Sequence, residues 1–188
     1  MAHRVCPWWM GPLLLNPLRR WTVKPEKLLA PYIRDGMTVL EPGPGMGFLT
    51  LPLAELVGLH GKVIAVDIQA KMLENLKLRA DRAGYAGRIQ TRLAVPDSLQ
   101  IPDLIGSIDF ALAFAMVHET PSADRFFREV TAALKPGAAA LLVEPSGHVR
   151  NEQFDAEIAA AQAAGLVVVG TPKISRNHAA LMRKPVGT

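Results

Sequence analysis

The segment at positions 41–47 has the sequence EPGPGMG, and the next apolar run along the chain ends in Asp67. Glycines lack a Cβ atom, so a chain rich in them turns tightly and lets a ligand approach its backbone. A carboxylate at the tip of the second strand of an α/β unit can accept hydrogen bonds from both ribose hydroxyls. The glycine segment and Asp67, which follows Gly43 by 24 residues, therefore together indicate a site for an adenosine-containing cofactor. The alternative is structural: a tight turn for the glycines and a helix cap for Asp67.

The glycine spacing argues against two common phosphate-binding loops. Dinucleotide-binding loops follow G-x-G-x-x-G/A, which would place Phe48 at the third small position. A phenylalanine there would hold the helix away from the strand and obstruct a pyrophosphate. No Gly-Lys-Ser/Thr follows the glycines, so a P-loop is absent as well.

The pattern E-x-G-x-G-x-G resembles motif I of the class I S-adenosylmethionine-dependent methyltransferases. Later segments resemble further motifs of that family in the same order: residues 63–68 with Met72, the turn Asp97-Ser98, residues 109–119, and the LKPG sequence at 134–137. The resemblance covers about residues 25–183. It implies S-adenosylmethionine as the cofactor, S-adenosylhomocysteine as the product, and methyl transfer as the reaction.

The resemblance also implies which residues bind the cofactor. The acid of motif II takes the ribose, apolar neighbours enclose the adenine, and an acidic turn contacts the adenine amino group. The residues at the matching positions are Glu41, Gly43, Pro44, Gly45, Gly47, Asp67, Ile68, Met72, Asp97, Ser98, Ala113 and Phe114.

His118 and Glu119 follow the expected fourth strand, where an acceptor would lie, and are the candidate catalytic residues. A histidine can act as a general base because its ordinary pKa lies near neutral pH. His118 could instead hold the start of the next segment through a backbone contact, and the sequence alone favours that structural role. Glu144 and His148 follow the fifth strand and are candidate substrate contacts.

The expected acceptor is a small molecule. The sequence AFAM at 113–116 replaces the Asn/Asp-Pro-Pro-Tyr/Phe tetrapeptide of enzymes that methylate base or side-chain amide nitrogens. Arsenite methyltransferases use several cysteines, and this chain has only Cys6. The alternatives are an RNA methyltransferase, supported only by a basic N-terminal arm, and a non-catalytic cofactor-binding module that serves a partner.

These site residues need a scaffold that brings strand ends together. Short apolar runs at 37–41, 62–66, 89–93, 108–113, 138–143, 167–169 and 178–182 alternate with helical patterns at 25–33, 48–56, 70–83, 122–134 and 151–164. This alternation predicts an α/β fold: a doubly wound, mostly parallel seven-stranded sheet with helices on both faces and an antiparallel last strand. Ligands of such sheets bind outside the carboxyl ends of the strands.

Residues 1–24 form an arm rich in tryptophan and proline, and residues 25–188 form the expected cofactor-binding domain. Residues 1–35 carry six of the 21 basic and two of the 17 acidic side chains, so the whole net charge of +4 lies there. Trp8 and Trp9 are candidate substrate contacts in a lid, although the arm could instead cover the sheet or anchor the chain to a membrane surface.

Composition narrows the remaining classes. About half of the residues are apolar and a fifth are charged, which is typical of a globular domain and not of a disordered chain. A single cysteine excludes an internal disulfide and a multi-thiolate zinc site, and no metal is expected. Prolines interrupt the early apolar run, and it lacks a small-x-small cleavage site. We therefore expect a cytoplasmic protein with no membrane span and leave its oligomeric state open.

Overall fold

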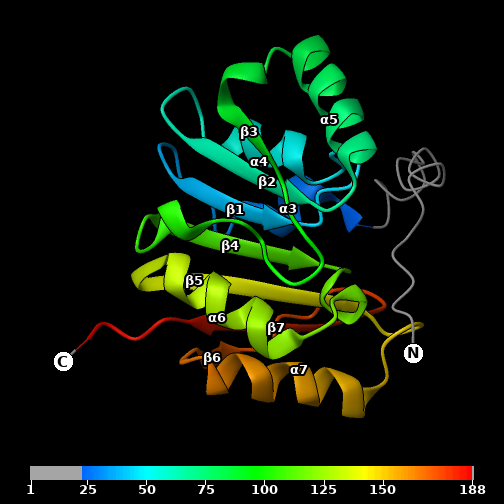
Figure 1. Cartoon of the computed structure of the whole chain (residues 1–188), viewed down its shortest axis with the longest axis vertical. Helices are drawn as coiled ribbons and strands as arrows, with labels where there is room; N and C mark the ends of the chain where they lie inside the picture. The colour runs from blue at the N-terminus through cyan, green and yellow to red at the C-terminus, as the bar shows by residue number, and fades with distance from the viewer. Residues whose placement is uncertain (1–22, 188) are drawn as a thin grey trace.

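The computed structural model describes residues 23–187. The expected arm, with Trp8 and Trp9, lies outside the described residues except for positions 23 and 24. The described chain alternates strands and helices as the sequence predicts (Figure 1). The strands are β1 (Thr38–Pro42), β2 (Lys62–Asp67), β3 (Ile89–Leu93), β4 (Ile108–Phe114), β5 (Leu134–Pro145), β6 (Val167–Gly170) and β7 (Asn177–Arg183). The main helices are α3 (Pro25–Leu29), α4 (Thr50–Leu56), α5 (Ala70–Ala83), α6 (Ala123–Ala133) and α7 (Asn151–Ala163).

The seven strands form one sheet in the order β3-β2-β1-β4-β5-β7-β6. The first five strands pair in parallel, and β7 runs antiparallel to both β5 and β6. The predicted fold class, including the antiparallel last strand, is therefore confirmed. The order reverses between β1 and β4, and such a switch point is where doubly wound sheets bind ligands.

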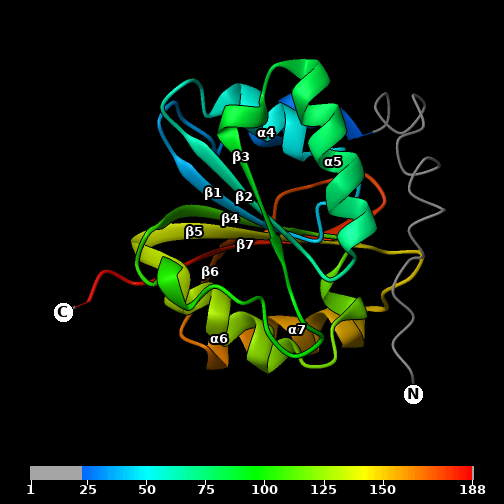
Figure 2. The ribbon, with the colours of Figure 1, turned by 45° about the horizontal axis from the view of Figure 1, so that its top comes forward.

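Helices cover both faces of this sheet, as Figure 2 shows, with α4 and α5 above it and α6 and α7 below. On one face, Val39 and Val63 pack with Leu53 of α4, and Ala65 packs with Leu76 of α5. On the other face, strand residues such as Ile64 pack in one core with residues of α6 and α7. Alternate residues of the central strands thus enter opposite cores, which explains their nearly continuous apolar sequences.

Several element boundaries differ from the predicted ones, most of them by one residue, and three of the larger differences have a clear cause. The first helix ends at Leu29 instead of residue 33, because Pro31 has no N–H with which to continue the helical hydrogen bonds, although Ala30 keeps helical angles. The second begins at Thr50 instead of residue 48, after the turn that follows Gly47. Strand β5 begins at Leu134 instead of residue 138, because Leu134 already pairs with Ile108 of β4.

Candidate active site

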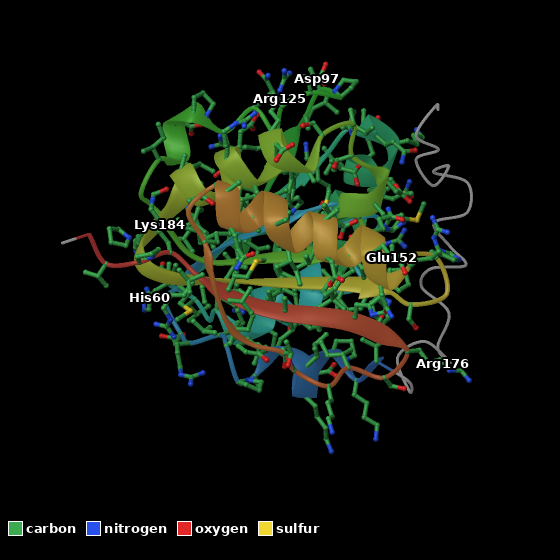
Figure 3. All side chains as sticks on the ribbon, turned by 90° about the horizontal axis from the view of Figure 1, so that it is seen from below. His60, Asp97, Arg125, Glu152, Arg176 and Lys184 are labelled. Atoms are coloured by element: carbon green, nitrogen blue, oxygen red, sulfur yellow. The ribbon has the colours of Figure 1, made fainter. Side chains whose placement is uncertain are left out.

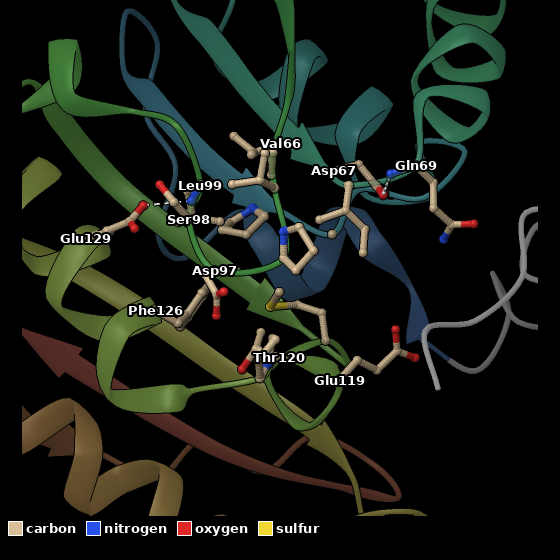
Figure 4. A pocket seen from close by; sticks show the side chains of 18 of the residues that line it. Val66, Asp67, Gln69, Asp97, Ser98, Leu99, Glu119, Thr120, Phe126 and Glu129 are labelled. Carbon is tan, nitrogen blue, oxygen red and sulfur yellow. Dashed lines mark hydrogen bonds between the residues drawn. The ribbon is translucent and has the colours of Figure 1, made fainter. Parts of the chain in front are cut away.

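A cavity of about 550 Å³ opens at the carboxyl ends of β1, β2 and β4 (Figure 4). This volume lies within the usual range for small-molecule sites. Its lining includes eight of the residues expected at the site, from four separate segments of the chain: Gly43, Gly45, Asp67, Ile68, Met72, Asp97, Ser98 and Glu119. Residues far apart in sequence are therefore brought to one place by the sheet.

The three glycines of the first loop have different surroundings. All have positive φ angles, +69° for Gly43, +54° for Gly45 and +87° for Gly47, which side chains rarely adopt. A Cβ at Gly43 would lie 2.8 Å from Met116 Cβ, and one at Gly47 would lie 2.5 Å from Leu76 Cδ1. A Cβ at Gly45 would meet no protein atom within 4 Å, and Gly45 lines the cavity. Gly43 and Gly47 thus allow close packing, whereas Gly45 leaves open space for a ligand.

Asp67, at the end of β2, is the most buried carboxylate that lines the cavity, with 9% of its surface exposed. Its Oδ1 accepts a hydrogen bond from the backbone N–H of Gln69 at 2.9 Å (Figure 4). Burial raises its pKa from 3.8 to about 6, and the Glu119 carboxylate adds to the rise, while backbone donors oppose it. The aspartate can accept hydrogen bonds from two ligand hydroxyls, and such donors would favour its ionised form.

Glu41, in strand β1, and Pro44, in the loop that follows it, do not line the cavity. Glu41 is 4% exposed, and its Oε2 has no hydrogen-bond partner among the described residues. Burial raises the pKa of Glu41 to about 7, the Thr50 hydroxyl opposes the rise, and the charge of Asp67 adds to it. Glu41 therefore places a buried carboxyl, which holds its proton to a higher pH than usual, next to the glycine segment.

The turn after β3, residues 94–99, forms another wall of the cavity. Its Leu99 N–H donates to Glu129 of α6 at 2.7 Å (Figure 4), and Asp97 Oδ1 lies 3.7 Å from Arg125 Nη1 of the same helix (Figure 3). The contact with Arg125 is exposed and adds little stability. The hydrogen bond to Glu129 involves a buried backbone group, and it anchors this wall on α6.

The end of β4 places Ala115 and Met116, not the expected Ala113 and Phe114, in the cavity lining. Ala113 is buried in the core shared with α6 and α7. Ala115 has a positive φ of 55°, and its N–H donates to the Val143 carbonyl at 2.7 Å. A non-glycine residue in this conformation stores strain, and such positions cluster at functional sites. This strained residue lies directly after β4, where the chain lines the cavity.

His118 and Glu144 lie behind the cavity wall rather than in it. The His118 Nδ1–H donates to Glu144 Oε2 at 2.5 Å, and Glu144 is fully buried with 0% exposure. Glu144 therefore contacts the histidine and is not presented to a substrate. His148 is exposed, and its ring meets His118 edge-on with 6.4 Å between centroids. The hydrogen bond to Glu144 raises the pKa of His118, burial opposes this, and nearby carboxylates add to it.

These features fit S-adenosylmethionine. The open space at Gly45 gives the ligand access to the backbone, and Asp67 offers a carboxylate for ribose hydroxyls. Met72 and Ile68 supply apolar contacts. The carboxylates of Asp67 and Glu119 create a negative environment, which suits a positively charged sulfonium.

Sequence reasoning missed a further group of lining residues: Gln69, Val95, Pro96, Leu99, Thr120, Pro121, Arg125, Phe126 and Glu129. Most lie within a few positions of the expected residues, so the loops after β2, β3 and β4 were the available signal. Glu129 and Arg125 come from α6 and gave no local signal.

Among the described residues, no group of three or more His, Cys, Asp or Glu side chains is arranged to hold a metal ion. None of the described helices is both long and apolar enough to cross a bilayer.

Comparison with known proteins adds an independent observation. A family model described as a methyltransferase domain matches residues 39–137, just over half of the chain. An arsenite methyltransferase from Aquipseudomonas alcaligenes is 34% identical over 145 residues, which cover 70% of this chain and 40% of that protein. A ubiquinone/menaquinone biosynthesis C-methyltransferase UbiE from Hahella chejuensis is 32% identical over 127 residues, covering 65% of this chain and 50% of that protein. The chain thus spans half or less of these curated relatives.

The fold has close counterparts among solved structures. The crystal structure of an S-adenosylmethionine-dependent methyltransferase from Aquifex aeolicus superposes with a TM-score of 0.85 and 22% sequence identity. The match covers 96% of this chain and 100% of that chain. At 22% sequence identity, this similarity shows that the two proteins share a fold.

Proposed function

The chain belongs to the methyltransferase-domain family that it matches over residues 39–137, and from this membership we propose that it transfers the methyl group of S-adenosylmethionine to a small-molecule acceptor. The observation that carries the proposal is the cavity in which Gly45 leaves open space beside Asp67. When bound, the cofactor supplies a methyl group already activated by the positive charge of its sulfonium.

The proposed cofactor contacts are those that the family resemblance implies, and the position of several of these residues in the cavity supports them. Asp67 accepts the ribose hydroxyls, Ile68 and Met72 contact the adenine, and Asp97 with Ser98 lies near its amino group. Gly43, Pro44, Gly47 and Glu41 shape the loop, and Ala113 and Phe114 support the wall from behind. The protein then has mainly to align the acceptor and exclude water.

Charge supports a small molecule over RNA as the acceptor. Of the 21 basic residues, three lie at positions 1–22, so the described region carries 18 basic and all 17 acidic residues. The described region is therefore nearly neutral overall, and such a net charge gives little electrostatic support for binding a polyanion. The two curated relatives are also named for small molecules, arsenite in one case and ubiquinone and menaquinone in the other. The single cysteine, Cys6, does not favour arsenite.

We place the acceptor beside the short 3-10 helix Val117–Glu119, because Glu119 lines the cavity there. His118 and Glu119 are the proposed catalytic residues, and exposed His148 is a proposed substrate contact. For residues 1–24, with Trp8 and Trp9, the proposal is a lid over the same opening.

Calorimetry with S-adenosylmethionine, S-adenosylhomocysteine and NAD tests this function. We expect the first two to bind and NAD not to bind. Asp67→Ala should weaken binding by about 1–3 kcal/mol, the scale of lost charge-assisted hydrogen bonds. Unchanged affinity in that variant would contradict the cofactor site. RNA binding that weakens steeply with added salt would favour the RNA alternative.

A further inference from the structure

A cluster of buried titratable groups lies behind the 3-10 helix Val117–Glu119, outside the cavity lining. His118 is hydrogen-bonded to Glu144 at the end of β5, and Glu157 on the inner face of α7 is near enough for its charge to act on both. Glu144 is 0% and Glu157 is 4% exposed. Burying two carboxyl groups in one place is costly unless they interact with a partner. We therefore ask which group these two buried carboxyl groups act on.

Glu144 fixes both the backbone and the ring of His118. Its Oε1 accepts from the backbone N–H groups of Val117 at 2.7 Å and His118 at 3.3 Å. Its Oε2 accepts from the ring Nδ1–H of His118 at 2.5 Å. In the neutral ring the lone pair then belongs to Nε2. One buried carboxylate thus sets the tautomer and the direction of the histidine.

The Nε2 atom of His118 lies beside a residue that lines the cavity. It lies 4.0 Å from Oε1 of Glu119, and Glu119 is itself a lining residue. The His118 side chain is 17% exposed. Its basic nitrogen therefore lies next to Glu119, the lining residue beside which we place the acceptor.

Further titratable groups surround this pair. Both oxygens of Glu157 are buried without a hydrogen-bond partner among the described residues. Burial raises the pKa of Glu157 to about 7, the charge of Glu144 adds to the rise, and His118 opposes it. The other facing groups are His148, edge-on to His118, and His178 of β7, which pairs opposite Glu144 and bonds the Val149 carbonyl. A positive charge on His118 would thus face two buried carboxyl groups.

Resting on the proposed function, we propose that His118 is the general base of the reaction, with Glu144 as its positioning residue and Glu157 as a buried carboxyl beside the pair, and that the acceptor atom is an oxygen or nitrogen carrying a proton. The acceptor lone pair forms the bond to the methyl carbon while the carbon–sulfur bond breaks and its electron pair stays on sulfur. The acceptor proton passes to His118 Nε2, and the imidazolium is balanced by Glu144. The proton then leaves to solvent, which restores the base.

The decisive experiment needs no acceptor. The ring nitrogens of the full-length protein, labelled with ¹⁵N-histidine, are followed by NMR across pH in saturated complexes with S-adenosylmethionine and with S-adenosylhomocysteine. A His118→Asn sample assigns the resonances. The two ligands differ by the methyl group and the positive charge on sulfur. A nearby positive charge disfavours protonation of the ring.

We expect Nδ1 of His118 to carry the proton of the neutral ring. We also expect its pKa to be lower in the S-adenosylmethionine complex by at least about half a unit, as a charge a few ångströms away requires. The His178 resonance should stay the same in the two complexes. Equal His118 titration in two saturated complexes, or a neutral ring protonated at Nε2, would overturn the inference while leaving the proposed function intact. Failure of both ligands to bind would overturn the proposed function, and the inference with it.

Variants test Glu144 and Glu157 in the same complexes. Glu157→Gln should lower the His118 pKa because a neighbouring negative charge is lost, whereas Glu152→Gln, an exposed change on the same helix, should not. Glu144→Gln should lower it further while ligand affinity stays within about threefold. If Glu144→Gln does not fold, the wild-type tautomer and the Glu157→Gln comparison still decide. An unchanged His118 titration in Glu157→Gln would contradict the role of Glu157.

Discussion

Glu41 makes the stability of the ligand-free protein depend on pH. Burial raises its pKa from 4.5 to about 7, so the native state holds this proton at pH values where the unfolded chain has lost it. Stability is therefore fully present below about pH 4.5 and is lost as the pH rises through about 7. One pKa unit corresponds to about 1.36 kcal/mol, so the full loss is about 3 kcal/mol.

Glu41→Gln removes this ionisation and keeps nearly the same shape. We expect the stability of the variant relative to wild type to rise by about 2–3 kcal/mol between pH 5 and pH 8.5. Comparing the two pH values cancels any constant cost of the buried amide. Urea unfolding followed by circular dichroism measures this, and the midpoint difference should change by about 1 M.

The matched control is Glu55→Gln, which changes an exposed glutamate of α4. Its stability should follow the wild-type pH dependence. If Glu41→Gln also follows the wild-type curve, the carboxyl does not titrate in the buried environment described here, and the reasoning fails. The Glu41→Gln variant should also bind S-adenosylmethionine less tightly, because the negative charge of ionised Glu41 near the glycine loop attracts the sulfonium and amino groups of the ligand.

Three further predictions concern the ligand. Gly45→Ala and Gly84→Ala both place a side chain at a positive φ with no protein atom within 4 Å, so urea unfolding should reveal similar destabilisation, by about 1 kcal/mol or more. Only Gly45→Ala should also lose affinity for S-adenosylhomocysteine, by tenfold or more in calorimetry, and equal affinities would place the ligand elsewhere. Ribose hydroxyls favour ionised Asp67, whose pKa is about 6, so wild-type affinity should fall as the pH drops below 6, and an equally steep fall in Asp67→Asn would contradict this. The three tryptophans lie at positions 8, 9 and 21, so a blue shift of tryptophan emission on adding S-adenosylhomocysteine is expected of a lid, and unchanged emission would argue against it.

The order of the fold could be predicted because its signals are local. Short β-branched runs alternate with segments of helical periodicity. Central strands such as β2 and β4 are buried on both faces, so their sequences are almost continuously apolar. The helix α5 was predicted with its observed bounds because its apolar spacing is regular and Gly84 ends it in a left-handed conformation. Boundaries at Leu29 and Leu134 were predicted less well, because they depend on a proline effect and on pairing with a distant strand.

Part of the candidate site was equally accessible from sequence. The glycine loop and Asp67 end consecutive parallel strands, and such ends must meet at one edge of the sheet. Their chemistry and their meeting place were therefore both encoded locally. The different surroundings of Gly45 and Gly47 were not, since Leu76 approaches Gly47 from another helix.

Only the tertiary structure decided what surrounds His118. Glu144 lies 26 residues along the chain and reaches the histidine because β4 and β5 are neighbours in the sheet. Glu157 has the sequence context of an ordinary helical residue, and it is buried because α7 packs against the sheet with that face inward. Residue type and spacing specify which groups can ionise. Burial and distance across elements determine at what pH they do so and which partner they face, and these are properties of the folded chain.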